Sequence, residues 1–172
     1  MIFLTLVGFG WSAFAQSFNK GDNVLNVGVG LGTYINDKGI SMTIPPISVS
    51  FEYGVVNLLD GKGGIGIGGY VSYLLRKSND YSFNDNFNVG DFIIGPRGLF
   101  HYQLIDNLDT YAGLLLGYDI VSFSHKDAQL SASKFYAAFF VGGRYYLTNN
   151  IAVFGELGYG ISPLQLGISY KF

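Results

Sequence analysis

Acidic and basic side chains recur inside segments that are otherwise apolar and rich in glycine. Six of them lie on the polar face of such segments: Glu52, Arg97, Asp119, Arg144, Glu156 and Lys171. Three acids and three bases enclosed together are expected to form ion pairs, because an unpaired buried charge is costly. We therefore predict a network of these charges inside the protein. It acts either as a plug that stabilises the structure or as a gate, in which the pairs exchange and a narrow water path opens.

Two histidines are candidates for acid–base chemistry. His125 lies beside Ser122, Ser124 and Asp127, and a histidine close to a serine can activate its hydroxyl as a nucleophile. The same stretch is also typical of a polar, solvated loop, and we expect no catalytic residue and no enzyme. His101 falls on the same face of its strand as the charged residues. We expect it to fill space inside the protein and to be hydrogen-bonded there.

Oxygen-rich side chains gather in the middle of the chain. They are Asn79, Asp80, Asn84, Asp85, Asn86, Asn88 and Asp91. Such side chains can bind Ca²⁺, but their spacing matches no defined calcium loop. We interpret the stretch as a polar loop and predict no metal and no cofactor. The chain has no cysteine and a net charge of −2, which excludes disulfides and thiolate chemistry and gives no reason to expect a nucleic-acid partner.

Apolar and polar residues alternate along the segments that must position these groups. In the last segment Leu164, Leu166, Ile168, Tyr170 and Phe172 share one face, and Gln165, Gly167, Ser169 and Lys171 share the other. Seven earlier segments show the same period of two, roughly at 24–33, 44–54, 64–76, 91–102, 109–121, 134–146 and 151–160. This period indicates β-strands. The predicted strands are long enough to cross a bilayer, which takes about 9–11 residues when the strand is tilted.

The charges decide which face of these strands is inside. Hydrophobic residues make up 49% of the chain and charged residues only 13%, against about 25% charged in ordinary proteins. The apolar faces carry almost no charge, and a protein in water cannot leave eight such stripes exposed. Apolar-out and polar-in is the pattern of a membrane barrel. The predicted fold class is all-β, an eight-stranded antiparallel up-and-down transmembrane β-barrel.

Tyrosines cluster at the ends of the predicted strands with outward parity. They are Tyr53, Tyr102, Tyr145 and Tyr170 at one end and Tyr73, Tyr118 and Tyr159 at the other. Amphipathic rings favour the two membrane interfaces, so we predict two aromatic belts. If the N-terminus is periplasmic, the first set faces the periplasm together with Phe172. The inner connections are then 55–63, 103–108 and 147–150, and the outer ones are 34–43, 77–90, 122–133 and 161–163.

The N-terminal stretch has the features of a secretory signal peptide. Ile2 to Val7 form an apolar core, and Ala13-Phe14-Ala15 forms a small-x-small cleavage site. We expect residues 1–15 to be removed on export and residues 16–172 to form one barrel domain. The usual basic region is missing before the apolar core, so we expect the natural start to lie upstream of Met1.

Three stretches near the end of the chain resemble a known group. Arg144 to Asn150, Phe154 to Gly160 and Leu166 to Phe172 look like the end of small outer-membrane β-barrel proteins of Bacteroidota-type bacteria. More broadly, the chain is similar to eight-stranded barrels of the OmpA, OmpX and OmpW type. The resemblance implies a bacterial outer-membrane location. It also implies recognition of the terminal aromatic residue, Phe172, by the barrel-assembly machinery.

The expected function is a structural or surface-interaction role of a monomeric barrel. Its outer loops would reach a host or surface ligand, and its wall would contact outer-membrane lipid. The first alternative is a narrow pore or carrier for small or hydrophobic solutes, although a barrel of about eight strands is filled by its own side chains. The second alternative, which the resemblance suggests, is a membrane enzyme that modifies lipid A.

Overall fold

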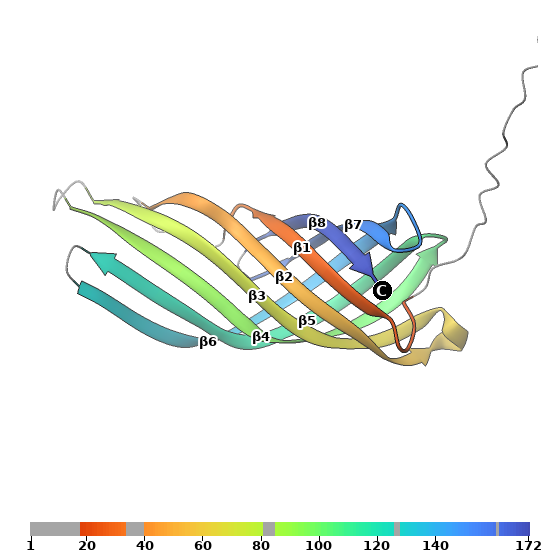
Figure 1. Ribbon diagram of the computed structural model, residues 1–172. Coiled ribbons are helices and arrows are strands. Elements are labelled where there is room, and N and C mark those ends of the chain that lie inside the picture. Colours follow the sequence, from red (N-terminus) through yellow and green to blue (C-terminus); the bar gives the residue numbers. More distant parts are fainter. Residues whose placement is uncertain (1–17, 34–39, 81–84, 126–127, 161) are drawn as a thin grey trace, which may run out of the picture.

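The chain folds into a closed ring of eight antiparallel strands (Figure 1). The computed structural model describes residues 18–33, 40–80, 85–125, 128–160 and 162–172. The strands are β1 (Asn23–Leu31), β2 (Ile40–Leu58), β3 (Gly63–Asp80), β4 (Asp85–Ile105), β5 (Leu108–His125), β6 (Ala128–Tyr146), β7 (Ile151–Tyr159) and β8 (Leu164–Lys171). A short 3-10 turn, Leu59–Gly61, joins β2 to β3. Among these residues, no helix has the length and apolar character needed to span a membrane. The predicted fold class is confirmed.

Each strand pairs with its neighbours in sequence, and β1 pairs with β8 to close the ring. The strands are joined by short connections at the end where β1 begins and β8 ends, which we call the terminal end. We call the opposite end the hairpin end, because the β3–β4 and β5–β6 hairpins reach furthest there (Figure 1). The predicted signal peptide, residues 1–15, lies outside the described residues.

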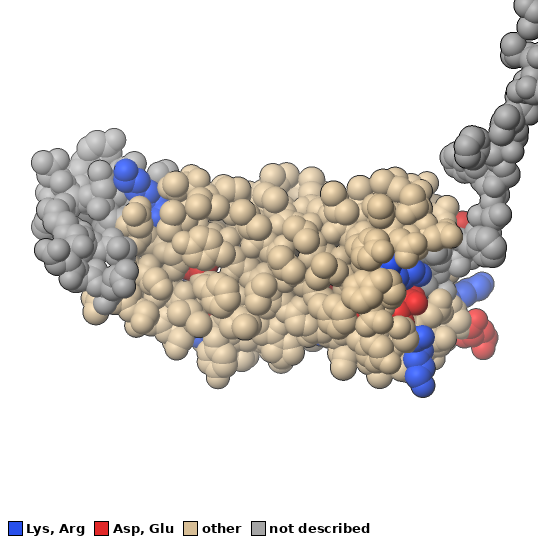
Figure 2. Space-filling view, in the orientation of Figure 1, with Lys and Arg blue, Asp and Glu red and all other residues tan. Residues whose placement is uncertain are grey.

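The two faces of the wall differ as the alternation requires. In β1, Leu25, Val27 and Val29 are 38–49% exposed, whereas Val24 and Asn26, which alternate with them, are buried. Successive side chains of a strand point to opposite faces, so the apolar set lies outside and the other set fills the lumen. On the face drawn in Figure 2, the middle of the barrel is almost free of charged atoms, and most of the charged groups that can be seen lie near its two ends.

The lumen is filled in layers. Most polar and charged side chains occupy the half nearer the terminal end, and an apolar layer lies beyond them toward the hairpin end, with the buried charges of Arg76, Asp91 and Asp119 beside or beyond it. The apolar layer consists of Tyr70, Leu74, Ile93, Leu99, Tyr111, Leu115 and Phe140, all buried. A barrel of about eight strands has an interior just wide enough for side chains, and here they occupy it.

Glycines on the lumen face make room for the aromatic rings of this filling. An added Cβ at Gly142 would lie 2.7 Å from the ring of Tyr111, and one at Gly113 would collide with the ring of Phe140. A larger residue could replace either glycine only if the facing ring, Tyr111 or Phe140, moved out of its place in the lumen. The size of these two rings therefore requires glycine at the positions that face them.

The strands are strongly unequal in length. β2 to β6 have 18–21 residues, whereas β1, β7 and β8 have 8 or 9. Consequently five strands continue past the closed part and project as an open sheet at the hairpin end (Figure 1). We call this part the projecting sheet.

The prediction that residues 77–90 and 122–133 form outer loops is wrong for most of their length. Strand pairing continues up to Asp80 and Asp85 in one hairpin and up to His125 and Ala128 in the other. The apolar period of two, from which the strands were predicted, fades in these stretches. Backbone pairing, in contrast, does not depend on that period, so the strands run on.

A charge on the lipid face should weaken the barrel more than the same charge on a turn. Val27, near the middle of β1, points outward and is 49% exposed. We expect Val27→Arg to lower the free energy of unfolding by about 2–4 kcal/mol, as for lipid-facing arginines in other barrels. Urea unfolding of the protein refolded into lipid vesicles measures this change.

The control is Asn149→Arg in the exposed turn between β6 and β7, which should alter the free energy by less than about 0.5 kcal/mol. Equal losses in the two variants would show that the outward face of β1 does not contact lipid.

Candidate functional site

Arg144 is the centre of the polar half of the lumen. Its side chain is completely buried, and its three nitrogens reach four strands other than its own. Nη2 donates to Glu52 Oε2 at 2.9 Å and to Asn26 Oδ1 at 3.2 Å, Nη1 donates to Asp109 Oδ2 at 3.1 Å, and Nε donates to Ser169 Oγ at 3.2 Å. A planar guanidinium with five N–H groups suits such divergent acceptors. Arg144 therefore ties β6 to β1, β2, β5 and β8 through the lumen.

Arg97 forms a second centre next to the first. Its Nη2 donates to Glu156 Oε1 at 2.8 Å and lies 3.5 Å from Glu52 Oε1, and its Nη1 donates to Ser50 Oγ at 3.1 Å. The hydroxyl of Tyr111 donates to the same Glu156 oxygen at 3.0 Å. Glu52 thus lies between the two arginines and links them. We call the connected set of Glu52, Arg97, Asp109, Arg144 and Glu156 the inner charge cluster.

His101 closes the cluster on the side of the terminal end. Its Nδ1 lies 3.0 Å from Asp109 Oδ2, and its Nε2 lies 3.7 Å from Glu52 Oε2. The ring of Phe18 stacks on the imidazole, with 3.9 Å between ring centroids and an interplanar angle of 20°. Phe18 is 2% exposed. The segment before β1 therefore folds into the mouth of the barrel and covers the cluster.

Four of the six predicted network charges come together in the cluster, and two do not. Asp119 pairs with Lys134 at 3.1 Å, further toward the hairpin end. Lys171 lies 3.4 Å from Asp22 at the terminal rim. Asp119 and Lys171 thus form separate pairs, because their positions along the barrel axis differ from that of Arg144.

Several members of the site were not singled out from the sequence. Asp109, Asn26, Ser50 and Ser169 have the inward parity of their strands, so the same alternation identifies them. Phe18 has no such signal, because it precedes the first strand.

The oxygen-rich stretch does not form one group. Asp91 is completely buried and receives a two-pronged contact from Arg76, whose Nη2 lies 2.7 Å from Asp91 Oδ2. Asn84 lies outside the described residues, as do the side chains of Asn79, Asp80, Asp85 and Asn86. Asp91 therefore belongs to the lumen filling and not to a loop.

His101 has no nucleophilic side chain bonded to it in the described part of the chain. Its Nε2 is buried and has no hydrogen-bond partner there, and its Nδ1 contacts Asp109. A histidine that activates a serine, threonine or cysteine needs that hydroxyl or thiol within hydrogen-bond reach. His125 ends β5, and its side chain lies outside the described residues, as does Asp127.

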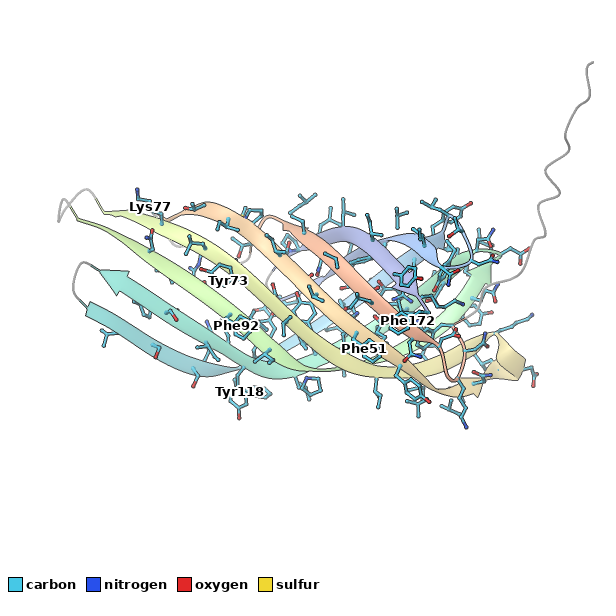
Figure 3. All side chains as sticks on the ribbon, viewed as in Figure 1. Phe51, Tyr73, Lys77, Phe92, Tyr118 and Phe172 are labelled. Atoms are coloured by element: carbon cyan, nitrogen blue, oxygen red, sulfur yellow. The ribbon has the colours of Figure 1, made fainter. Side chains whose placement is uncertain are left out.

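The seven predicted interface tyrosines all point outward and are 38–70% exposed. Tyr73, Phe92 and Tyr118 lie at a similar position along the barrel axis (Figure 3), and Phe51 and Phe172 lie nearer the terminal end. The Phe172 ring stacks on Tyr170, with 6.0 Å between centroids, and lies 6.4 Å from Phe51. Strand register places Tyr53 opposite Asn23, Tyr102 opposite Gly63 and Tyr145 opposite Val153, all near the terminal end.

Neither a model of a protein family nor a curated protein matches the chain. Solved structures do match. Ail of Yersinia pestis, solved in complex with the heparin analogue sucrose octasulfate, aligns with a TM-score of 0.56 at 14% identity, covering 89% of this chain and 99% of that chain. The N-terminal β-barrel domain of Pseudomonas aeruginosa OprF aligns with a TM-score of 0.52 at 15% identity, covering 90% and 100%.

The outer membrane protein OprG of Pseudomonas aeruginosa aligns with a TM-score of 0.52 at 12% identity, covering 91% of this chain and 98% of that chain. The chain has the fold of the small eight-stranded outer-membrane barrels. These neighbours are bacterial outer-membrane proteins, which is the location that the sequence predicts. Sequence identities this low establish the outer-membrane barrel fold and leave function to be argued from the residues.

Breaking the inner charge cluster should destabilise the barrel strongly. Arg144→Met removes one charged partner of Glu52 and one of Asp109 and leaves both carboxylates buried. We expect the free energy of unfolding to fall by about 3–5 kcal/mol, the usual cost of removing one partner of a buried ion pair. Urea unfolding in lipid vesicles measures the loss.

Lys171→Met is the matched control, since Lys171 also points inward but pairs with Asp22 at the rim, where both side chains are partly exposed. Its loss should be at most about 1 kcal/mol. A loss for Arg144→Met no greater than that of the control would contradict a stabilising role of the cluster.

Proposed function

We propose that this protein is a structural outer-membrane barrel that presents a surface for interaction with other polypeptides. The observation that supports the proposal is the projecting sheet, which leaves one edge of β6 unpaired. β6 pairs with β5 over Ala128–Tyr145 but with β7 only over Phe139–Tyr146. Within the described strands, residues 128–135 of β6 thus have no strand paired with them on one side.

Apolar side chains run toward this free edge across the inner face of the projecting sheet. Strand register places Val89, Phe123 and Leu130 in one row over β4, β5 and β6. Their exposed fractions rise from 3% to 39% to 71%, because the short strands β7, β8 and β1 do not cover this face. The row therefore ends at the edge with a large apolar side chain in solvent.

A free strand edge beside an apolar side chain is a template for strand addition. Main-chain hydrogen bonds give affinity in this mode, and alternate side chains give specificity. Proteins normally protect such edges with charge or proline. Between Leu130 and Ala138 the edge carries one charge, Lys134, which pairs with Asp119. The chemistry thus favours an extended polypeptide as the ligand, with an apolar residue facing Leu130.

The remaining parts of the proposal follow from the sequence. Residues 1–15 direct export, Phe172 serves the barrel-assembly machinery, and the two sets of outward tyrosines lie at the membrane interfaces. The hairpin end then faces the outside of a monomeric barrel. Ail, the neighbour solved with a heparin analogue, supports ligand binding by a barrel of this fold. The filled lumen, with Leu74 and Ile93 completely buried, disfavours the gate and the open pore.

The direction of the barrel can be tested with introduced cysteines, since the chain has none of its own. We expect Ser131→Cys, on the projecting sheet, to react with a membrane-impermeant maleimide on intact cells. Asn149→Cys, at the terminal end, should react only after the outer membrane is permeabilised. The opposite labelling pattern would exclude a surface role of the projecting sheet.

Strand addition can be tested with strand-forming decapeptides of alternating threonine and valine. We expect them to slow amide hydrogen exchange in residues 130–138 of the protein in bicelles. Leu130→Asp should weaken this binding about tenfold, because it loses an apolar cross-strand contact and adds charge at the edge. Leu147→Asp, a leucine 60% exposed at the terminal end, is the control and should leave binding unchanged. Peptides that protect no amide of β6 would rule out this mode of recognition.

A further inference from the structure

The free edge of β6 carries one exposed charge. On the inner face of the projecting sheet, three of the charged side chains that the structure describes are buried, namely Arg76, Asp91 and Asp119. Arg76 and Asp91 pair with each other, with Arg76 Nη2 2.7 Å from Asp91 Oδ2. The fourth is Lys134, whose side chain is 60% exposed although it pairs with the covered Asp119 at 3.1 Å. A strand that approaches this edge therefore meets a positive charge whose counter-charge is out of reach.

The ammonium of Lys134 has room for a second partner. A lysine ammonium has three N–H donors, and the pair with Asp119 uses one of them. Asp119 lies opposite Lys134 on β5. On the other side of Lys134 no described strand is paired, because the pairing of β6 with β7 ends at Phe139 and Tyr159. An acidic side chain of an added strand can occupy that side.

The spacing along β6 defines the order of side chains in such a strand. Leu130, Ala132 and Lys134 share the inner face, so a large apolar residue, a small residue and a basic residue follow one another along the edge. An added strand that pairs antiparallel reads this order in reverse. Its acid then lies four residues before its apolar residue. Antiparallel pairing is the slightly more stable arrangement per residue.

If Tyr118 marks the membrane interface, as proposed above, the edge lies on its aqueous side. The ring of Phe135 packs edge-on against the ring of Tyr118, with 6.4 Å between centroids. Residues 130–134 continue from Phe135 toward the hairpin end. A segment therefore reaches them without entering lipid, and the attraction between its acid and Lys134 is weakened by salt.

A second copy of the chain in the same membrane does not fit this edge. Two copies related by a two-fold axis along the membrane normal have β6 strands that run in the same direction along that normal, so these strands cannot pair antiparallel. The strand tilt, about 35–45° in such barrels, is reversed between the copies, so the two edges cross. The occupant is therefore a separate extended segment.

We infer that the free edge of β6 selects an extended segment with an acidic side chain four residues before a large apolar one, the acid on Lys134 and the apolar residue on Leu130. The inference rests on the proposed strand addition and names the sequence that this mode prefers. Main-chain hydrogen bonds supply the affinity, and Lys134 determines the specificity.

The test compares decapeptides of alternating valine and threonine with valine at the odd positions, acetylated and amidated so that no terminal charge remains. The third residue is aspartate, asparagine or lysine, and the seventh is valine. Amide hydrogen exchange of residues 130–135 in the full chain in bicelles gives each affinity. At low salt we expect the aspartate peptide to bind about threefold more tightly than the asparagine peptide, and the lysine peptide about threefold more weakly. These differences should vanish near 1 M salt.

Two variants and one further peptide serve as controls. Lys134→Gln should remove the preference for aspartate in a barrel that keeps its heat-modifiable gel mobility. Lys77→Gln, which changes an exposed lysine on β3, should leave the preference unchanged. A peptide with aspartate seventh and valine third should bind more weakly than the reverse order, because its acid faces Leu130.

The possible failures are distinguishable. Equal protection by the aspartate, asparagine and lysine peptides, or a preference for aspartate that survives Lys134→Gln or 1 M salt, would overturn the inference and leave strand addition standing. Tighter binding of the peptide with aspartate seventh would overturn the inferred order. Protection by none of the peptides would overturn the proposed function together with the inference.

Discussion

Pairing of β1 with β8 is the contact on which every other part of the barrel depends. Lipid offers no hydrogen-bond partner to a strand edge, so a sheet can cross a bilayer only as a closed ring. Eight residue pairs between β1 and β8, from Val24–Lys171 to Leu31–Leu164, complete this ring. Once the ring is closed, the outward face must be apolar, and every polar side chain on the inward face must find its partner within the lumen.

The inner charge cluster is a consequence of that enclosure. Arg144 and Arg97 bind acceptors on strands that are far apart in sequence, such as Glu52 and Glu156. Their pairs hold the wall together from the inside in the half of the lumen nearer the terminal end. Toward the hairpin end the enclosure stops on one side only, and the free edge of β6 arises there.

Much of this arrangement was accessible from the sequence, because a period of two assigns each residue to a face. It correctly placed Glu52 and Arg144 inside and Tyr53 and Tyr118 outside. It did not reveal that Asp119 meets Lys134 instead of the cluster, because partners across the lumen depend on the stagger between strands. It also missed how far β3 to β6 extend toward the hairpin end, where the apolar alternation fades, and the position of Phe18.

Phe18 also bears on the order in which the molecule assembles. Its ring lies against His101 of β4, and an added Cβ at Gly66 of β3 would lie 3.1 Å from it. These contacts do not exist until β3 and β4 have been synthesised and paired. The segment before β1 is synthesised ahead of all the strands, yet it reaches its place only after β3 and β4 have paired, and it then covers the inner charge cluster at the terminal end.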